Sequence, residues 1–189
     1  MAITQNAFSN SSSSIIIGKV NGNIVDILLP PLSPFEMTAA FALGAVTRGL
    51  AVGVAVAAAM AFFVPVGVHH WGWLLYFAFS GSLLLGLLGV FAGIWADKFD
   101  HLATITNFII TPLSFLSGTF YSIERLPGIW WTLAHANPFF FMIDGMRYAM
   151  TGHTDSSSLF LGAGVLLALN AVLWAGCQQM FASGYKLKA

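Results

Sequence analysis

The chain has 189 residues, of which 7% are charged, whereas about a quarter of the residues in a soluble domain are charged. Seven Lys and Arg residues balance seven Asp and Glu residues, so charge gives no reason to expect nucleic acid as a partner. Hydrophobic residues make up 58% and the mean hydropathy is +0.82, which leaves too little polar surface for a water-facing globule. The single Cys177 excludes an intramolecular disulfide and a multi-cysteine zinc site. The composition predicts an all-α integral membrane protein with one membrane domain over residues 1–189.

The first segment, MAITQNAFSNSSSS, is rich in Asn and Ser and lacks the basic start and apolar core of a secretory signal. Taken alone, it is either a short disordered tail or the frayed end of a larger element.

Residues 15–29, IIIGKVNGNIVDILL, place apolar side chains at steps of four. These are Ile16, Val20, Ile24 and Leu28. The pattern predicts one amphipathic helix that ends at Pro30 and Pro31. Such a helix either lies in the headgroup region or docks onto a cytosolic partner.

Four stretches are long and apolar enough to be spanning helices, over residues 34–68, 71–96, 101–121 and 158–183. Ser33, Pro34 and Glu36 form a capping-box pattern at the start of the first. Pro112 predicts a kink in the third. The pairs Gly49/Gly53 and Gly89/Gly93 are GxxxG motifs, for which packing within the chain is favoured over a dimer contact.

The segment 122–157 is too apolar and aromatic for a solvated loop. Asn137 and Pro138 separate two short helical pieces in it. We expect a re-entrant pair of half-helices in the outer leaflet, because irregular backbone at membrane depth must be buried in protein or line a cavity.

The basic residues predict the orientation of the chain. One side of the predicted bundle holds Lys19, Lys98, Lys186 and Lys188, and the other holds Arg125 and Arg147. This distribution favours cytoplasmic positions for both ends of the chain. Arg48 lies inside the first span, where snorkelling to the interface or pairing within the protein is favoured over a substrate site.

The sequence contains no catalytic motif that we can identify. The only Gly-Lys pair, Gly18 and Lys19, has Ser13 where GxxxxGK[ST] requires Gly and Val20 where it requires Ser or Thr. HExxH and GxSxG are also absent from the sequence. We therefore expect no ATP hydrolysis, no metal and no bound cofactor on this chain, and a separate partner that supplies energy.

Two regions resemble a known family. GKVNGNIVDILLPPLSPFE followed by TRGL at residues 47–50, and PLSFLSGTFYSIERLP followed by Asn137, Pro138 and Arg147, are similar to bacterial type-2 ABC exporter permeases. The resemblance implies an inner-membrane permease with six membrane helices that works as a dimer. Each subunit would dock onto a cytosolic ATP-binding-cassette subunit, which would bind ATP and Mg. Family members export polysaccharides, lipo-oligosaccharides, drugs and other amphiphiles.

The resemblance also assigns residues. ATPase coupling would involve Lys19, Gly22, Asn23 and Asp26, and an outer gate would involve Phe115, Ser117, Gly118, Pro127, Asn137, Pro138 and Arg147. By the same resemblance, MAITQNAFSNSSSS would be the cytoplasmic end of the second membrane helix, so the chain is expected to be a fragment. A non-transporting accessory or scaffold membrane protein is the alternative, and an intramembrane enzyme dependent on Ser80 or His135 is a third possibility.

Overall fold

The computed structural model describes residues 1–64, 67–119, 132–133, 135–154 and 158–187, and every regular element within these ranges is helical. The elements are α1 (Ala2–Val20), α2 (Ile24–Leu28), α3 (Pro34–Ala61), α4 (Trp71–Trp95), α5 (Phe99–Ile105), the π-helix η1 (Thr106–Ile110), α6 (Thr111–Phe115), α8 (Pro138–Thr151) and α9 (Leu159–Ser183). Of the helices described, α3, α4 and α9 are long and apolar enough to cross a membrane. The chain is therefore an all-α membrane protein with at least these candidate spans.

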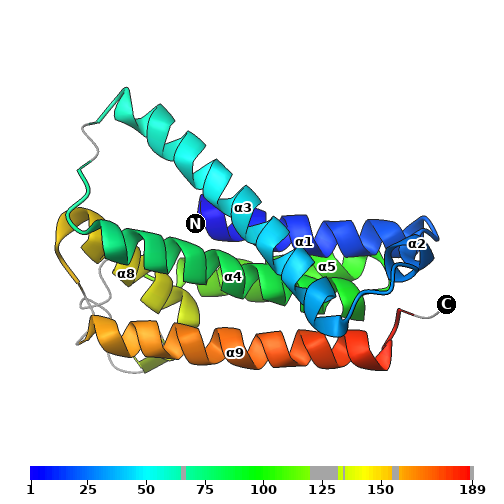
Figure 1. Ribbon diagram of the computed structural model, residues 1–189. Helices are drawn as coiled ribbons and strands as arrows, with labels where there is room; N and C mark the ends of the chain where they lie inside the picture. The colour runs from blue at the N-terminus through cyan, green and yellow to red at the C-terminus, as the bar shows by residue number, and fades with distance from the viewer. Residues whose placement is uncertain (65–66, 120–131, 134, 155–157, 188–189) are drawn as a thin grey trace.

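Helix α4 is the centre of the bundle. It packs against α1 and α9 along most of its length, and α8 covers its first turns (Figure 1). Helix α3 lies against α1 and α4 near its start and diverges from them toward its end (Figure 1). We call the end that carries α2 and the end of α9 the α2 end, and the end that carries Trp71 and the end of α8 the α8 end.

The serine-rich start of the chain is not a disordered tail. It belongs to α1, which runs without interruption through Val20. The hydroxyls of Ser12 and Ser14 donate to backbone carbonyls one turn earlier, and Ser11 donates both to Ala7 O and, at 2.8 Å, to Gly86 O on α4. Small side chains whose hydroxyls bond to helix carbonyls can pack closely against another helix, which explains why a polar segment is buried here.

The glycine motifs serve packing within the chain, as expected. A Cβ built on Gly89 would lie 2.5 Å from Phe8 O, and one on Gly93 would lie 3.0 Å from Ser12 O, so both glycines face α1. Gly49 faces the same helix, with Ile3 O at 3.0 Å from its ideal Cβ. These contacts allow α1 to approach both α3 and α4 at backbone distance.

The predicted single helix over residues 15–29 is wrong. The chain forms a turn at residues 21–23, and the short α2 follows it. Gly22 has φ = 75°, a left-handed conformation that interrupts an α-helix and that glycine adopts without a Cβ clash. The turn breaks the predicted apolar face: Ile16 and Ile24 are buried, whereas Val20 is exposed.

Helix α3 begins at the predicted capping box. The Ser33 N–H donates to Glu36 Oε2 at 2.7 Å, and the Glu36 N–H donates to Ser33 Oγ at 3.3 Å. The helix ends at Ala61, before the predicted limit of residue 68, and Phe62 and Phe63 lie in a turn. Pro65 follows shortly in the sequence, and the residue before a proline is disfavoured in helical conformation.

The predicted span over residues 101–121 is shorter and less regular than expected. Helix covers residues 99–115, and its middle turn, just before Pro112, is the π-helix η1. Thr111 Oγ1 donates to Thr106 O at 2.8 Å, which satisfies a carbonyl in the π-helical turn. The helix ends at Phe115 because a turn follows in which Gly118 has φ = 76°.

Only the second half of the predicted re-entrant pair lies in the described residues, and it forms α8. Asn137 is its N-cap, Pro138 its first residue and Gly152, with φ = 76°, its C-cap. The first half falls mostly on residues outside the described part of the chain. Helix α9 begins after the N-cap Ser158 and ends at Gly184.

Candidate functional site

The turn and helix α2 carry three of the four residues assigned to ATPase coupling. Gly22, Asn23 and Asp26 are all exposed at the α2 end. The fourth, Lys19, does not share this surface. Its side chain is only 12% exposed, and its ammonium donates to Ile94 O at 2.8 Å and to Ala96 O at 2.5 Å. Lys19 therefore binds the end of α4, while its neighbours in sequence remain open to a partner.

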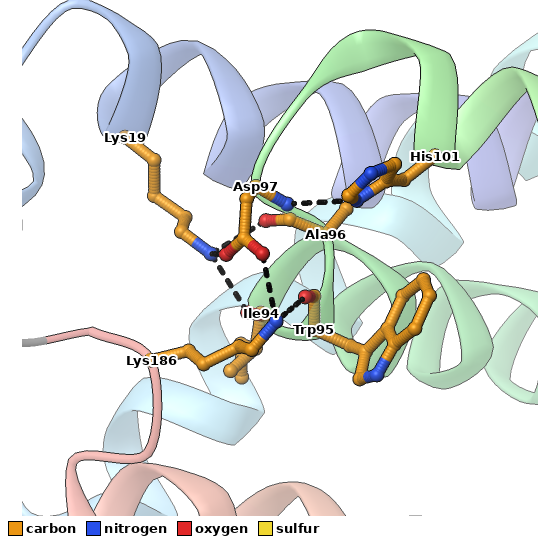
Figure 2. A network of polar contacts seen from close by, with 7 residues as sticks. All are labelled: Lys19, Ile94, Trp95, Ala96, Asp97, His101 and Lys186. Carbon is orange, nitrogen blue, oxygen red and sulfur yellow. Dashed lines mark hydrogen bonds and ion pairs between the residues drawn. The ribbon is translucent and has the colours of Figure 1, made fainter.

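A second lysine reaches the same helix end from the other side of α4 (Figure 2). Lys186, in the segment after α9, donates to Trp95 O at 2.9 Å and to Asp97 Oδ2 at 2.8 Å. Its ammonium also lies 5.4 Å from the centroid of the Trp95 ring, within the range of a cation–π contact. Asp97 Oδ1 lies 3.7 Å from the Lys19 ammonium, so one carboxylate contacts both lysines. We call Lys19, Asp97 and Lys186 the polar node.

The end of a helix explains why two cations gather here. The last carbonyls of α4 have no partner within the helix and carry its negative dipole end, so ammonium groups satisfy and stabilise them. The hydrogen bond from Lys186, followed by the charges of Lys186, Lys19 and His101, lowers the pKa of Asp97 below its usual value of 3.8. Asp97 is therefore a carboxylate at neutral pH.

The backbone after α9 is shaped to bring Lys186 to this position. Gly184 is left-handed at φ = 64°, and Lys186 itself is left-handed at φ = 53°, which is uncommon for a residue with a Cβ. Leu187 is buried in a cluster with Ile15 and Ile94. The segment after α9 therefore lies against the end of α4, because Leu187 is buried there and Lys186 is hydrogen-bonded there.

Sequence analysis did not identify Asp97 and Lys186 as a site. Charge counting placed Lys19, Lys98 and Lys186 on one side of the bundle, and in the structure Lys19 and Lys186 meet at Asp97 while Lys98 follows it in the chain. Lys188 lies outside the described residues. The signal in the sequence was Asp97, an acidic residue in the short turn between the predicted spans 71–96 and 101–121. Counting charges on each side of the membrane does not show which lysine this residue contacts.

Several residues assigned to the outer gate come together at the α8 end. Asn137 Nδ2 donates to Leu113 O on α6 at 2.6 Å, and Asn137 Oδ1 accepts from the Phe139 N–H at 3.0 Å. Arg147, on α8, donates to Gly118 O at 2.5 Å. Helix α8 is thus hydrogen-bonded at two points, once to α6 and once to the turn that follows α6.

The remaining assigned residues complete this region. Ser117 is buried and donates to Ser114 O at 2.5 Å, and Pro138 occupies the first turn of α8. Phe115 is exposed rather than packed in the core. Pro127 lies outside the described residues. The structure therefore brings Ser117, Gly118, Asn137, Pro138 and Arg147 to one junction.

Two polar residues in the spans are bonded within the protein. Arg48 Nη1 donates to Asn10 Oδ1 at 2.8 Å, so a neutral amide of α1 supplies one hydrogen-bond partner for this exposed guanidinium. Ser80 Oγ accepts from Asn170 Nδ2 at 3.0 Å, and an amide cannot serve as the base that a serine nucleophile needs. The partner of Ser80 gives no support to an intramembrane hydrolase.

Comparisons with known proteins identify the family. The family profile described as "ABC-2 type transporter" matches residues 1–151. The chain is 34% identical over 189 residues to "Inner membrane transport permease YadH" of Escherichia coli (strain K12), an alignment that covers 100% of this chain and 73% of that protein.

Two further relatives align over part of the chain. "Nodulation protein J" of Rhizobium leguminosarum bv. trifolii is 33% identical over 113 residues, which cover 58% of this chain and 40% of that protein. "Nodulation protein J" of Neorhizobium galegae is 32% identical over 120 residues, or 61% and 43% of the two chains. No solved structure matches the chain.

The profile match, the full-length similarity to a transport permease and the apolar helices agree with one another. The chain belongs to the ABC-2 type transporter family and is a membrane permease of that type.

Proposed function

We propose that this chain is the membrane-spanning subunit of an ATP-binding-cassette exporter in a bacterial inner membrane. It forms the translocation path and couples it to ATP hydrolysis by a separate cytosolic subunit. The α2 end faces the cytoplasm. The end of α1 that carries Lys19 and the segment after α9 that carries Lys186 both lie on that side. The similarity to YadH, an inner membrane transport permease, supports this assignment.

The observation that carries the coupling role is an apolar surface around α2. It consists of the exposed side chains of Ile17, Val20, Val25, Leu29, Leu32 and Phe35. Leu29, in the connection between α2 and α3, is 70% exposed. The exposed Asn23 and Asp26 adjoin this surface. An apolar patch with polar residues at its margin is typical of a protein interface.

The short α2 suits a part that transmits force. The turn with Gly22 separates it from α1, and Pro30 and Pro31 separate it from α3. A displacement of α2 by the partner would therefore move both α1 and α3. A rigid-body switch between inward-facing and outward-facing states requires such a coupled movement of helices. The junction of Asn137 and Arg147 with α6 is the corresponding candidate for the outer gate.

Transport by this family member would also need a second permease subunit. Phe108 and Ile109, on the π-helix, are exposed, as is Phe115 on α6. Apolar side chains on an irregular helix are a candidate contact with a second copy, and cysteine cross-linking at Ile109→Cys tests it. A cross-linked dimer in membranes supports the proposal, and a chain that stays monomeric at every labelled position on this helix contradicts it.

Co-purification tests the coupling role. The tagged chain is expressed together with a candidate ATP-binding-cassette subunit from the same genome and extracted in mild detergent. We expect the two to co-purify, and Asp26→Arg to reduce the recovered ATPase at least tenfold while membrane insertion is unchanged. Asp100→Arg is the matched control, because it makes the same charge change at the α2 end outside α2. If Asp26→Arg retains the ATPase as well as Asp100→Arg does, α2 is not the docking element.

A further inference from the structure

We propose that the polar node is a latch that makes α1, α4 and α9 move as one unit at the α2 end. In this proposal Asp97 is a positioning residue through which a displacement of α1 and α2 reaches α9. The proposal rests on the proposed function, since ATP-driven movement of the partner would supply the displacement. The latch itself is a property of this chain alone, and it can be measured without the partner.

The arrangement of the helices allows such a connection. Helix α4 lies between α1 and α9 (Figure 1). Side chains of both helices donate hydrogen bonds to its carbonyls. From α1, Ser11 bonds Gly86 O and Lys19 bonds Ile94 O. A movement of α1 can therefore reach α9 by way of α4, and α3, which contacts both α1 and α9, offers a second route.

Helix α9 and α4 are joined by polar contacts at intervals along their length. Tyr76 Oη donates to Ala163 O at 2.7 Å, Asn170 Nδ2 donates to Ser80 O at 3.1 Å, and Cys177 Sγ lies 3.5 Å from Leu87 O. Lys186 adds the contact closest to α2, at Trp95 O and Asp97. It is the outermost of these polar contacts, so its loss removes the polar link at the end of α9 and leaves apolar contacts there, such as that of Phe181 with Phe41.

The geometry of Asp97 suits a shared link. Its two carboxylate oxygens contact different lysines, which lie 167 residues apart in the sequence. Lys186 is held by a direct hydrogen bond, whereas Lys19 is 3.7 Å away and bonds mainly to carbonyls. Asp97 is half exposed, and exposed ion pairs are weak, so the latch can open and close without a large barrier.

The backbone at Lys186 gives independent support. A left-handed lysine is unfavourable unless surrounding contacts fix it. Here the contacts are the node on one side and the buried Leu187 on the other. Breaking the node removes one of them, so we expect the segment after α9 to leave the end of α4.

Distance measurements between two spin labels test the latch. Ser14→Cys on α1 and Ala182→Cys on α9 are exposed labelling sites, and the native Cys177 is retained because its thiol is buried and contacts Leu87 O on α4. The full chain is reconstituted in nanodiscs with its ATPase subunit, and labelled chains are diluted with unlabelled ones so that only distances within one chain are read. We expect a narrow distribution that a non-hydrolysable ATP analogue does not change, because α1 and α9 move together.

Lys186→Met is expected to broaden this distribution without nucleotide and to make its mean shift when the analogue is added. Lys186→Arg keeps the charge and should behave as the parent chain does. Lys98→Met is the matched control, since it removes an exposed lysine at the same end that adjoins Asp97 in sequence. A Lys186→Met distribution equal to that of Lys98→Met, with and without the analogue, overturns the latch.

The two proposals fail in different ways. If the ATPase does not bind, the proposed function fails, and the broadening without nucleotide still decides whether the latch exists. If the ATPase binds and α9 follows α1 in Lys186→Met as in the parent chain, coupling at α2 stands and the latch is wrong.

Discussion

Asn137 connects α8 to α6 through both ends of its amide: Nδ2 donates to Leu113 O at 2.6 Å, and Oδ1 caps α8 by accepting from the Phe139 N–H at 3.0 Å. The side chain is 3% exposed, so both bonds are made away from solvent. One residue thus begins a helix and fixes that helix to its neighbour. This double role leads to a prediction that separates the two bonds.

Asn137→Ala removes both bonds and leaves Leu113 O without this partner. Loss of an N-cap and of a buried hydrogen bond costs about 1–3 kcal/mol in total. Asn137→Ser keeps a capping oxygen but is too short to replace the bond to Leu113, so its cost should be smaller. Unfolding in mixed micelles with increasing SDS measures both values. Equal losses for the two variants would mean that the capping bond contributes nothing, and a Ser variant as stable as the parent chain would mean that the bond to Leu113 contributes nothing.

The turn before α2 gives a second prediction. Gly22 has φ = 75°, and a Cβ built on it meets no heavy atom within 4 Å, so only the backbone conformation restricts this position. Gly22→Asn should be tolerated because Asn visits the left-handed region, whereas Gly22→Val should cost about 1–2 kcal/mol locally and misdirect α2. Recovery of the co-expressed ATPase is the measurement, with membrane insertion as the control. Equal recovery with Asn and Val would show that the left-handed turn does not position α2.

Close packing of α1 on α4 gives a third prediction. The ideal Cβ of Gly89 would lie 2.5 Å from Phe8 O, which is backbone and cannot rotate away. Gly89→Ala should therefore destabilise the bundle by about 1–3 kcal/mol, as overpacking does. Gly176→Ala is the matched control, because nothing lies within 4 Å of its Cβ. SDS unfolding should show a loss for Gly89→Ala alone, and an equal response of both variants would contradict the close approach of α1.

The sequence predicted features whose causes are local. Ser33, Pro34 and Glu36 specify the start of α3 within four residues of chain, and Asn137 with Pro138 specifies the start of α8. Each of these signals acts through hydrogen bonds or a fixed φ angle next to it in the chain. Such starts can be predicted without knowledge of the fold.

The features that were missed depend on a neighbour distant in sequence. The composition of residues 1–14 left a disordered tail and the end of a larger element both open, and only the family resemblance indicated a helix. In the structure residues 2–14 belong to α1, and the buried face of this segment packs where Gly89 and Gly93 leave room on α4. Asp97 is one acidic residue in a short turn until the fold places Lys19 and Lys186 beside it. The family resemblance assigned Arg147 and Gly118 to one outer motif without predicting a contact between them, and in the structure Arg147 donates a hydrogen bond to Gly118 O.

Acid should weaken the contact between Asp97 and Lys186. The hydrogen bond from Lys186, aided by nearby positive charges, holds the pKa of Asp97 below 3.8 in the folded chain. A carboxyl whose pKa is lower when folded stabilises the fold fully above its unfolded pKa, and this contribution is lost as pH falls through the folded value. The stabilisation should therefore be constant from neutral pH down to about pH 5 and should decline below pH 4.

Spin-label distances between Ser14→Cys and Ala182→Cys, recorded from pH 7 to pH 3, measure this effect. We expect the distribution to stay narrow at the upper end of the range and to broaden at the lower end, because a protonated Asp97 no longer attracts the two ammonium groups. Asp97→Asn provides the reference, since its amide does not titrate in this range and its distribution should already be broad at pH 7. Broadening of the parent and of Asp97→Asn by the same amount on acidification would assign the change to groups other than Asp97 and would remove Asp97 as its cause.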